Sequence, residues 1–183
     1  MPPARGKPVH NHPNRLRFDG ILTTVDQVSD APPSGARGHR VILTRGAALA
    51  ALPSLIGMAV DYRPSWDGHD SRRKCGIVTY ADVLVDELHI RGYIFAKDFP
   101  DVAEVALTRD DLGMSWELDK AHIEDMRAEN WVIGRATFTG AAILRKDEAA
   151  YRTTSFRVGK DTDTDVWTPE TVSLFAAITP PRR

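Results

Sequence analysis

The segment LGMSWELDK, residues 112–120, places a serine and two carboxylates at alternate positions. In an extended strand side chains alternate between two faces, so Ser115, Glu117 and Asp119 would share one face. The apolar side chains between them would point the other way, into a core: Met114, Trp116 and Leu118. Such alternation is common in ordinary edge strands, so the pattern by itself leaves open whether Ser115 takes part in chemistry.

A second candidate for chemistry is His69, which lies in the polar loop WDGHD between two predicted strands. An imidazole ionises near neutral pH and can act as a general base there. A serine hydroxyl is a poor nucleophile until such a base takes its proton, so His69 and Ser115 together could perform acyl transfer. Only the fold can bring them together, and His69 could equally be a loop histidine hydrogen-bonded to Asp67 or Asp70.

Length and composition exclude several classes of protein. The 183 residues fit one domain, and 42% hydrophobic with 27% charged residues is ordinary for a globular protein that is not embedded in a membrane. A net charge of −1 argues against both nucleic-acid binding and membrane binding. The single cysteine, Cys75, excludes an internal disulfide and a cysteine-based zinc cluster. P-loop, dinucleotide-binding, HExxH and GxSxG motifs are absent from the sequence.

Residues 1–14, rich in proline, are expected to form a flexible arm, 15–158 one folded domain, and 159–183 a partly ordered tail. A metal-binding role for His10 and His12 is the less favoured interpretation of that arm. The pattern predicts an α+β protein built on a closed or nearly closed sheet. The predicted strands are 15–25 (bent at Gly20), 39–44, 55–62, 75–80, 87–95, 112–120 and 129–140. The predicted helices are 45–53, ended by Pro53, and 100–109, with a short helix or irregular wrap at 141–156.

Five segments, taken in order from about residue 16 to about 156, resemble the prohead (capsid maturation) serine proteases of tailed bacteriophages. They are FDGILTTVDQ, WDGHDSRRKCGIVT, DELHIRGYIFAKDFPDVAEVAL, GMSWEL and WVIGRATFTGAAI. In that family an HD pair precedes a strand with glycine, and a G-[LMV]-S motif carries the nucleophile. The resemblance implies a compact β-barrel-like core with short surrounding helices, the fold shared with herpesvirus assemblins.

The resemblance makes Ser115 the nucleophile and His69 the general base of a serine endopeptidase. Its third catalytic member is less defined, because Val132 stands where many relatives have an acid. Glu117, on the predicted face of Ser115, is the favoured third member. The alternatives are Glu129, Asp70 and His122. The last is included because assemblins use a second histidine.

Where the family has "V-T-x-P-A", this chain has Thr139-Gly140-Ala141 in place of the proline. Backbone N–H groups after this strand, and Arg135, are candidates to stabilise an oxyanion, although a solvated Arg135 is the simpler interpretation. Trp116 is expected in the core. Trp66 is expected either to line a substrate groove or to be an ordinary half-buried loop aromatic.

The function implied by the resemblance is processing of the scaffold protein, the major capsid protein or both during prohead maturation. It would take place in the host cytoplasm, inside the assembling procapsid, without a metal or organic cofactor. Homodimerisation is a further expectation. The alternative is a catalytically inactive capsid assembly or stabilising protein on the same fold, which the missing acid at Val132 suggests.

Overall fold

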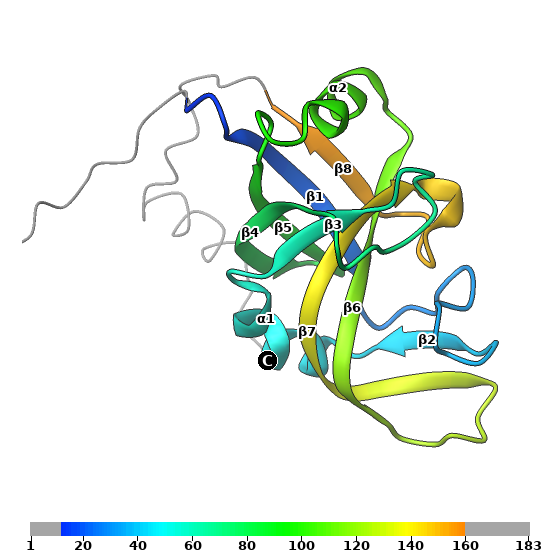
Figure 1. Ribbon diagram of the computed structural model, residues 1–183. Helices are drawn as coiled ribbons and strands as arrows, with labels where there is room; N and C mark the ends of the chain where they lie inside the picture. Colours follow the sequence, from blue (N-terminus) through cyan, green and yellow to red (C-terminus); the bar gives the residue numbers. More distant parts are fainter. Residues whose placement is uncertain (1–11, 160–183) are drawn as a thin grey trace, which may run out of the picture.

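The computed structural model describes residues 12–159, which form one curled mixed sheet with two α-helices (Figure 1). The strands are β1 (Leu16–Thr24), β2 (Arg40–Leu43), β3 (Ala59–Tyr62), β4 (Lys74–Leu84), β5 (Glu87–Ile94), β6 (Leu112–Ile123), β7 (Asn130–Arg145) and β8 (Ser155–Val158). The helices are α1 (Arg45–Leu55) and α2 (Pro100–Thr108), with a short 3-10 turn, η1 (Lys146–Glu148). The predicted α+β class, with a barrel-like sheet and short helices, is confirmed.

The sheet is organised around β7, its longest strand. The strand order is β2-β7-β3-β4-β5-β1-β8, and β6 pairs with the remaining edge of β7. One edge of β7 pairs in parallel with β2 near residues 130–133 and with β3 near 141–143. The other edge pairs antiparallel with β6 along its length. Strands β3, β7 and β6 therefore lie side by side, although β3 is far from the other two in sequence.

Strand β6 also packs against β1, where the Met114 side chain lies over the backbone of Gly20. A Cβ atom on Gly20 would stand 2.8 Å from the sulfur of Met114 and 2.4 Å from the carbonyl oxygen of Ser155. Glycine at this position lets β1 approach both neighbours. The irregularity in β1 is a register shift between Ile21 and Thr23, just after the predicted bend at Gly20.

The predicted end of α1 at Pro53 is wrong, because the helix continues to Leu55. A proline in the last turn removes a single intrahelical hydrogen bond, which the local packing tolerates. Leu55 is fully buried, and the Ser54 hydroxyl donates to the Ala51 carbonyl at 2.6 Å. The predicted strand 55–62 is consequently shortened to β3, which follows a turn at Gly57 with φ of 84°.

The segment 141–156 is also different from its prediction as a short helix or irregular wrap. Residues 141–145 continue β7, and β8 begins at Ser155, after η1. The run AAIL at 141–144 is buried, and β3 and β6 pair with the two edges of its first part. A continuous apolar run is typical of a strand buried on both faces, and a helix pattern cannot be distinguished from it by periodicity alone.

Other predicted elements agree with the structure. Strands β4 and β5 form a hairpin whose turn contains Asp86, as predicted. Helix α2 begins at Pro100 and ends one residue before the predicted 109. No helix within residues 12–159 combines the length and apolar character needed to cross a membrane.

Most of the predicted arm 1–14 and of the predicted tail 159–183 lies outside the described residues. At the boundary of the arm, the Asn14 side chain donates to Asp98 Oδ2 at 2.7 Å and accepts from the Lys97 N–H at 2.8 Å. These contacts place the start of the described chain beside the segment that leads into α2.

Cys75 in β4 is expected to be chemically inert in the folded protein. Its side chain is fully buried, its thiol donates to the Val60 carbonyl at 3.4 Å, and burial raises the pKa of the thiol to about 12. The thiolate is the reactive form, so a disulfide reagent at about pH 8 should label the native protein at least about a hundredfold more slowly than the protein in concentrated urea. Rapid labelling of the native protein would contradict the burial of Cys75.

Candidate active site

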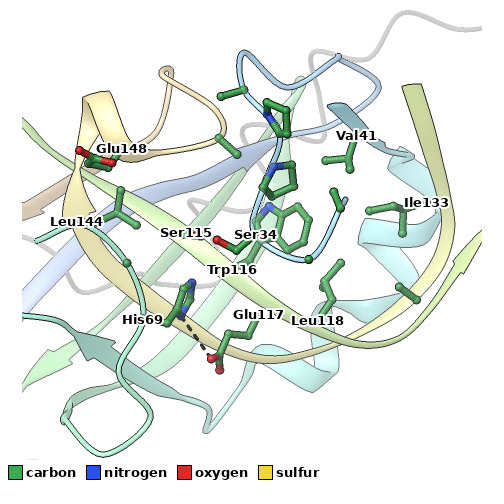
Figure 2. A pocket seen from close by; sticks show the side chains of 18 of the residues that line it. Ser34, Val41, His69, Ser115, Trp116, Glu117, Leu118, Ile133, Leu144 and Glu148 are labelled. Carbon is green, nitrogen blue, oxygen red and sulfur yellow. Dashed lines mark ion pairs between the residues drawn. The ribbon is translucent and has the colours of Figure 1, made fainter. Parts of the chain in front are cut away.

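A cavity of about 680 Å³ opens between loop 31–36, loop 63–69 and strands β6 and β7. Three of its lining residues are the sequence-predicted Ser115, His69 and Glu117 (Figure 2). The rest of the lining is mixed: its apolar part includes Val41, Trp116, Leu118, Trp131, Ile133 and Leu144, and its polar part Ser34, Arg63, Asp67, Thr139 and Glu148. The fold therefore gathers the predicted nucleophile, base and third member at one accessible site with both polar and apolar walls.

Strand pairing aligns Ser115 with a carboxylate that the sequence analysis did not single out. Ala142 of β7 pairs with Ser115 of β6 on one side and with Asp61 of β3 on the other. Residues paired directly across strands present their side chains on the same face of a sheet. Asp61 and Ser115 thus share a face, separated by the methyl group of Ala142.

Glu117 occupies the same face two residues further along β6. It pairs with Gly140 of β7, and a Cβ atom on Gly140 would stand 2.8 Å from Glu117 Oε2. The glycine leaves the space in which the Glu117 carboxylate lies against β7. A small residue at position 140 therefore has a structural role in this chain.

The exposed side chain of Arg63 stabilises the loop that carries His69 through hydrogen bonds within that loop. The Arg63 guanidinium donates to the His69 carbonyl at 2.9 Å and to Asp67 Oδ1 at 3.2 Å. Asp70 directs its backbone N–H at Asp61 Oδ1, at 3.3 Å, and its carboxylate accepts from Arg72. Neither Asp67 nor Asp70 contacts the imidazole in this arrangement, so His69 is not the simple loop histidine of the alternative interpretation.

The His69 ring lies between carboxylates on one side and Ser115 on the other. His69 Nδ1 is 3.5 Å from Asp61 Oδ1 and 3.5 Å from Glu117 Oε1. The second ring nitrogen, Nε2, lies on the side of the ring toward Ser115 (Figure 2). Both nitrogens are shielded from solvent, and neither has a hydrogen-bond partner within residues 12–159.

Asp61 is fully buried, and the ammonium of Lys74 balances its negative charge. Lys74 Nζ donates to Asp61 Oδ2 at 2.9 Å. Burial opposes ionisation of this carboxyl, but the nearby His69 ring and the hydrogen-bonded ammonium of Lys74 outweigh it and lower the pKa of Asp61. A buried Asp within a short predicted strand was the signal that could have identified this residue, since buried charges are paired.

Three further residues singled out from the sequence lie elsewhere. His122 and Glu129 were alternatives for the third catalytic member, and Arg135 was a candidate to stabilise the oxyanion. His122 and Arg135 pair across the far part of the β6–β7 hairpin, and both are exposed. Glu129 is exposed as well, and its carbonyl oxygen contacts the His39 ring. None of these three lines the cavity, so Arg135 cannot serve an oxyanion there in this arrangement.

The two tryptophans differ in how they relate to the cavity. Trp116 is partly buried and packs against the core, as the strand pattern predicted, but it also lines the cavity. Trp66 is absent from the cavity lining and packs on Tyr62 with ring centroids 5.4 Å apart, as an ordinary half-buried loop aromatic.

Two solved structures of a viral protease resemble this chain. A Kaposi's sarcoma-associated herpesvirus protease in complex with a hexapeptide phosphonate inhibitor is 15% identical, with a TM-score of 0.49, and the match covers 92% of this chain and 78% of that one. The same virus's protease with an allosteric inhibitor is 13% identical, with a TM-score of 0.47, and the match covers 88% of each chain. Both belong to a herpesvirus, so the bacteriophage assignment stays a prediction.

No family model matches the chain, and no curated protein matches it. The case for its chemistry therefore rests on the residues of the site.

Asp61→Asn tests the charge balance of the buried site. Because the pKa of Asp61 is lowered by folding, its stabilisation is fully present above the ordinary value of 3.8 and is lost as the pH falls through the lowered folded value. We expect Asp61→Asn to reduce the free energy of unfolding by about 1–3 kcal/mol near pH 7, and the difference from the unsubstituted protein to shrink in strong acid. Urea unfolding at several pH values measures both, with the exposed Asp110→Asn as control. A difference independent of pH would contradict this account.

Proposed function

We propose that this protein is a serine endopeptidase with Ser115 as nucleophile and His69 as general base. The observation that carries the proposal is the position of the His69 ring. Its Nδ1 faces two carboxylates at 3.5 Å, while Nε2 faces the side of Ser115 and is buried without a hydrogen-bond partner in the described part of the chain. In serine peptidases a carboxylate orients the histidine through one ring nitrogen, and the other ring nitrogen takes the proton of the serine. The carboxylates, His69 and Ser115 follow one another in that order here.

In the proposed reaction, Ser115 Oγ attacks the carbonyl carbon of a peptide bond and its proton passes to His69 Nε2. The tetrahedral intermediate collapses, the C–N bond breaks, and His69 returns the proton to the leaving amine. Water then attacks the acyl-enzyme by the same route, with His69 again taking and returning the proton. The imidazolium formed in each step is stabilised by the carboxylates beside Nδ1.

Two carboxylates are available for that orienting role, and they differ in environment. Glu117, the predicted third member, is about one-third exposed and lines the cavity. Asp61 is fully buried and already paired with Lys74. We assign the orienting role to both, since their carboxylate oxygens are equally distant from Nδ1.

The proposed substrates are the scaffold and major capsid proteins of a tailed bacteriophage, processed inside the assembling procapsid in the host cytoplasm. This part of the proposal is supported by the ordered sequence resemblance to prohead proteases. The apolar part of the cavity lining beside Ser115, which includes Trp116, Leu118 and Leu144, suits an apolar substrate side chain next to the scissile bond. A homodimer is the proposed assembly.

The nucleophile can be tested without knowing the substrate. A fluorophosphonate, which phosphonylates activated serines, should add one label to the full chain, as seen by intact mass. Ser115→Ala should abolish labelling, and His69→Ala should slow it by about a thousandfold, because the hydroxyl then has no base. Ser71→Ala and His89→Ala are matched controls, since Ser71 is exposed and His89 pairs with Glu87 outside the cavity. Labelling that survives Ser115→Ala would overturn the assignment.

The substrate class requires a second experiment. Co-expression with the cognate scaffold and capsid proteins should give discrete fragments by intact mass. These fragments should disappear with Ser115→Ala and persist with Ser71→Ala. If Ser115 is labelled by the fluorophosphonate but the scaffold and capsid proteins stay uncleaved, the peptidase assignment is retained and these substrates are rejected.

The second candidate function is an inactive capsid assembly or stabilising protein on the same fold. His69 Nε2 forms no hydrogen bond within residues 12–159, so Ser115 is not engaged by its base in this arrangement, and this favours the inactive protein. Absence of labelling and of fragments, together with capsids that assemble only when the protein is present, would establish this function instead.

A further inference from the structure

Three potential metal ligands converge below the His69 ring. Asp61 Oδ1, His69 Nδ1 and Glu117 Oε1 lie within 4.8 Å of one another. In a tetrahedral zinc site with bonds of 2.0–2.1 Å, neighbouring ligand atoms are about 3.3–3.4 Å apart. Both nitrogen-to-oxygen distances are 3.5 Å, so small side-chain shifts would complete this geometry.

The ligand atoms are also free to coordinate. His69 Nδ1 has no hydrogen-bond partner among residues 12–159 and is shielded from solvent. Asp61 Oδ1 accepts one backbone N–H, from Asp70 at 3.3 Å, which leaves it a second lone pair. Lys74 pairs with the other oxygen of Asp61, so the carboxylate is held in place while Oδ1 faces the histidine.

We propose that Asp61, His69 and Glu117 form a binding site for a zinc-class divalent cation, with the fourth coordination position open to the cavity. One imidazole and two carboxylates suit Zn²⁺, which accepts nitrogen and oxygen ligands in a four-coordinate site. Mg²⁺ and Ca²⁺ are poorer fits because they prefer all-oxygen sets with six or more ligands.

Cation binding would oppose the proposed peptidase activity, and this consequence rests on the proposed function. A neutral imidazole that donates its Nδ1 lone pair to the cation carries its proton on Nε2. Nε2 then cannot take the Ser115 proton. Bound Zn²⁺ should therefore inhibit peptide hydrolysis reversibly, and a chelator should restore it.

Two neighbours outside the ligand set should tune the affinity. The ammonium of Lys74 repels a cation at Asp61, so Lys74→Gln should bind Zn²⁺ about three- to tenfold more tightly. Gly140→Ala would displace the flexible end of Glu117, because the added Cβ would stand 2.8 Å from Oε2. We expect that displacement to weaken binding by about tenfold without removing a ligand.

Calorimetric titration of the full chain with Zn²⁺ alone tests the site. Ser115→Ala serves as the background, so that the result does not depend on peptidase activity. His10→Ala and His12→Ala are added to it, since these two histidines could bind zinc independently. We expect one Zn²⁺ per chain, with binding weakened more than about tenfold by each of Asp61→Asn, His69→Gln and Glu117→Gln. The matched control is Glu87→Gln, which alters an acid–histidine pair outside the cavity.

X-ray absorption at the zinc edge should report one nitrogen and several oxygen neighbours at about 2.0–2.2 Å. Absence of saturable binding, or binding unchanged by His69→Gln and Glu117→Gln, would overturn the metal site. Binding as expected in a protein that shows no fluorophosphonate labelling would retain the metal site and reject the peptidase. Fluorophosphonate labelling without zinc binding would retain the peptidase and reject the metal site.

Discussion

The site depends on one row of strand pairing, in which Ala142 of β7 joins Asp61 of β3 to Ser115 of β6. Neighbouring strands lie about 4.8 Å apart, so the two functional side chains stand roughly two strand spacings from each other. An imidazole can occupy that interval only if the residue between them is small. The length of β7 makes this possible, since the short strands β2 and β3 share one of its edges while β6 occupies the other.

Charge balance is the second constraint on the site. Two carboxylates, Asp61 and Glu117, face one imidazole, and Lys74 neutralises the buried one. A carboxylate buried without such partners would be strongly disfavoured. The same arrangement that would stabilise an imidazolium during proton transfer also offers three ligands to a cation. The proposed catalysis and the proposed metal binding therefore compete for one nitrogen, His69 Nδ1.

The differences between prediction and structure have a common cause, which is burial decided by distant residues. Pro53 did not end α1, because packing of Leu55 outweighs the hydrogen bond that proline removes. The apolar run at 141–144 became strand because β3 and β6 pair with both of its edges. None of these contacts leaves a local signal in the sequence.

The sequence by itself determined the α+β class, most strand positions, and the shared face of Ser115 and Glu117, because alternation and turn residues are local properties. It also supplied His69 as a candidate base, from residue type and loop context. Only the tertiary structure decided that His69 lies between Ser115 and two carboxylates, and that Asp61 is one of them. The parallel pairing of β3 with β7 joins positions 61 and 142, and a pairing over such a separation is set by the whole sheet.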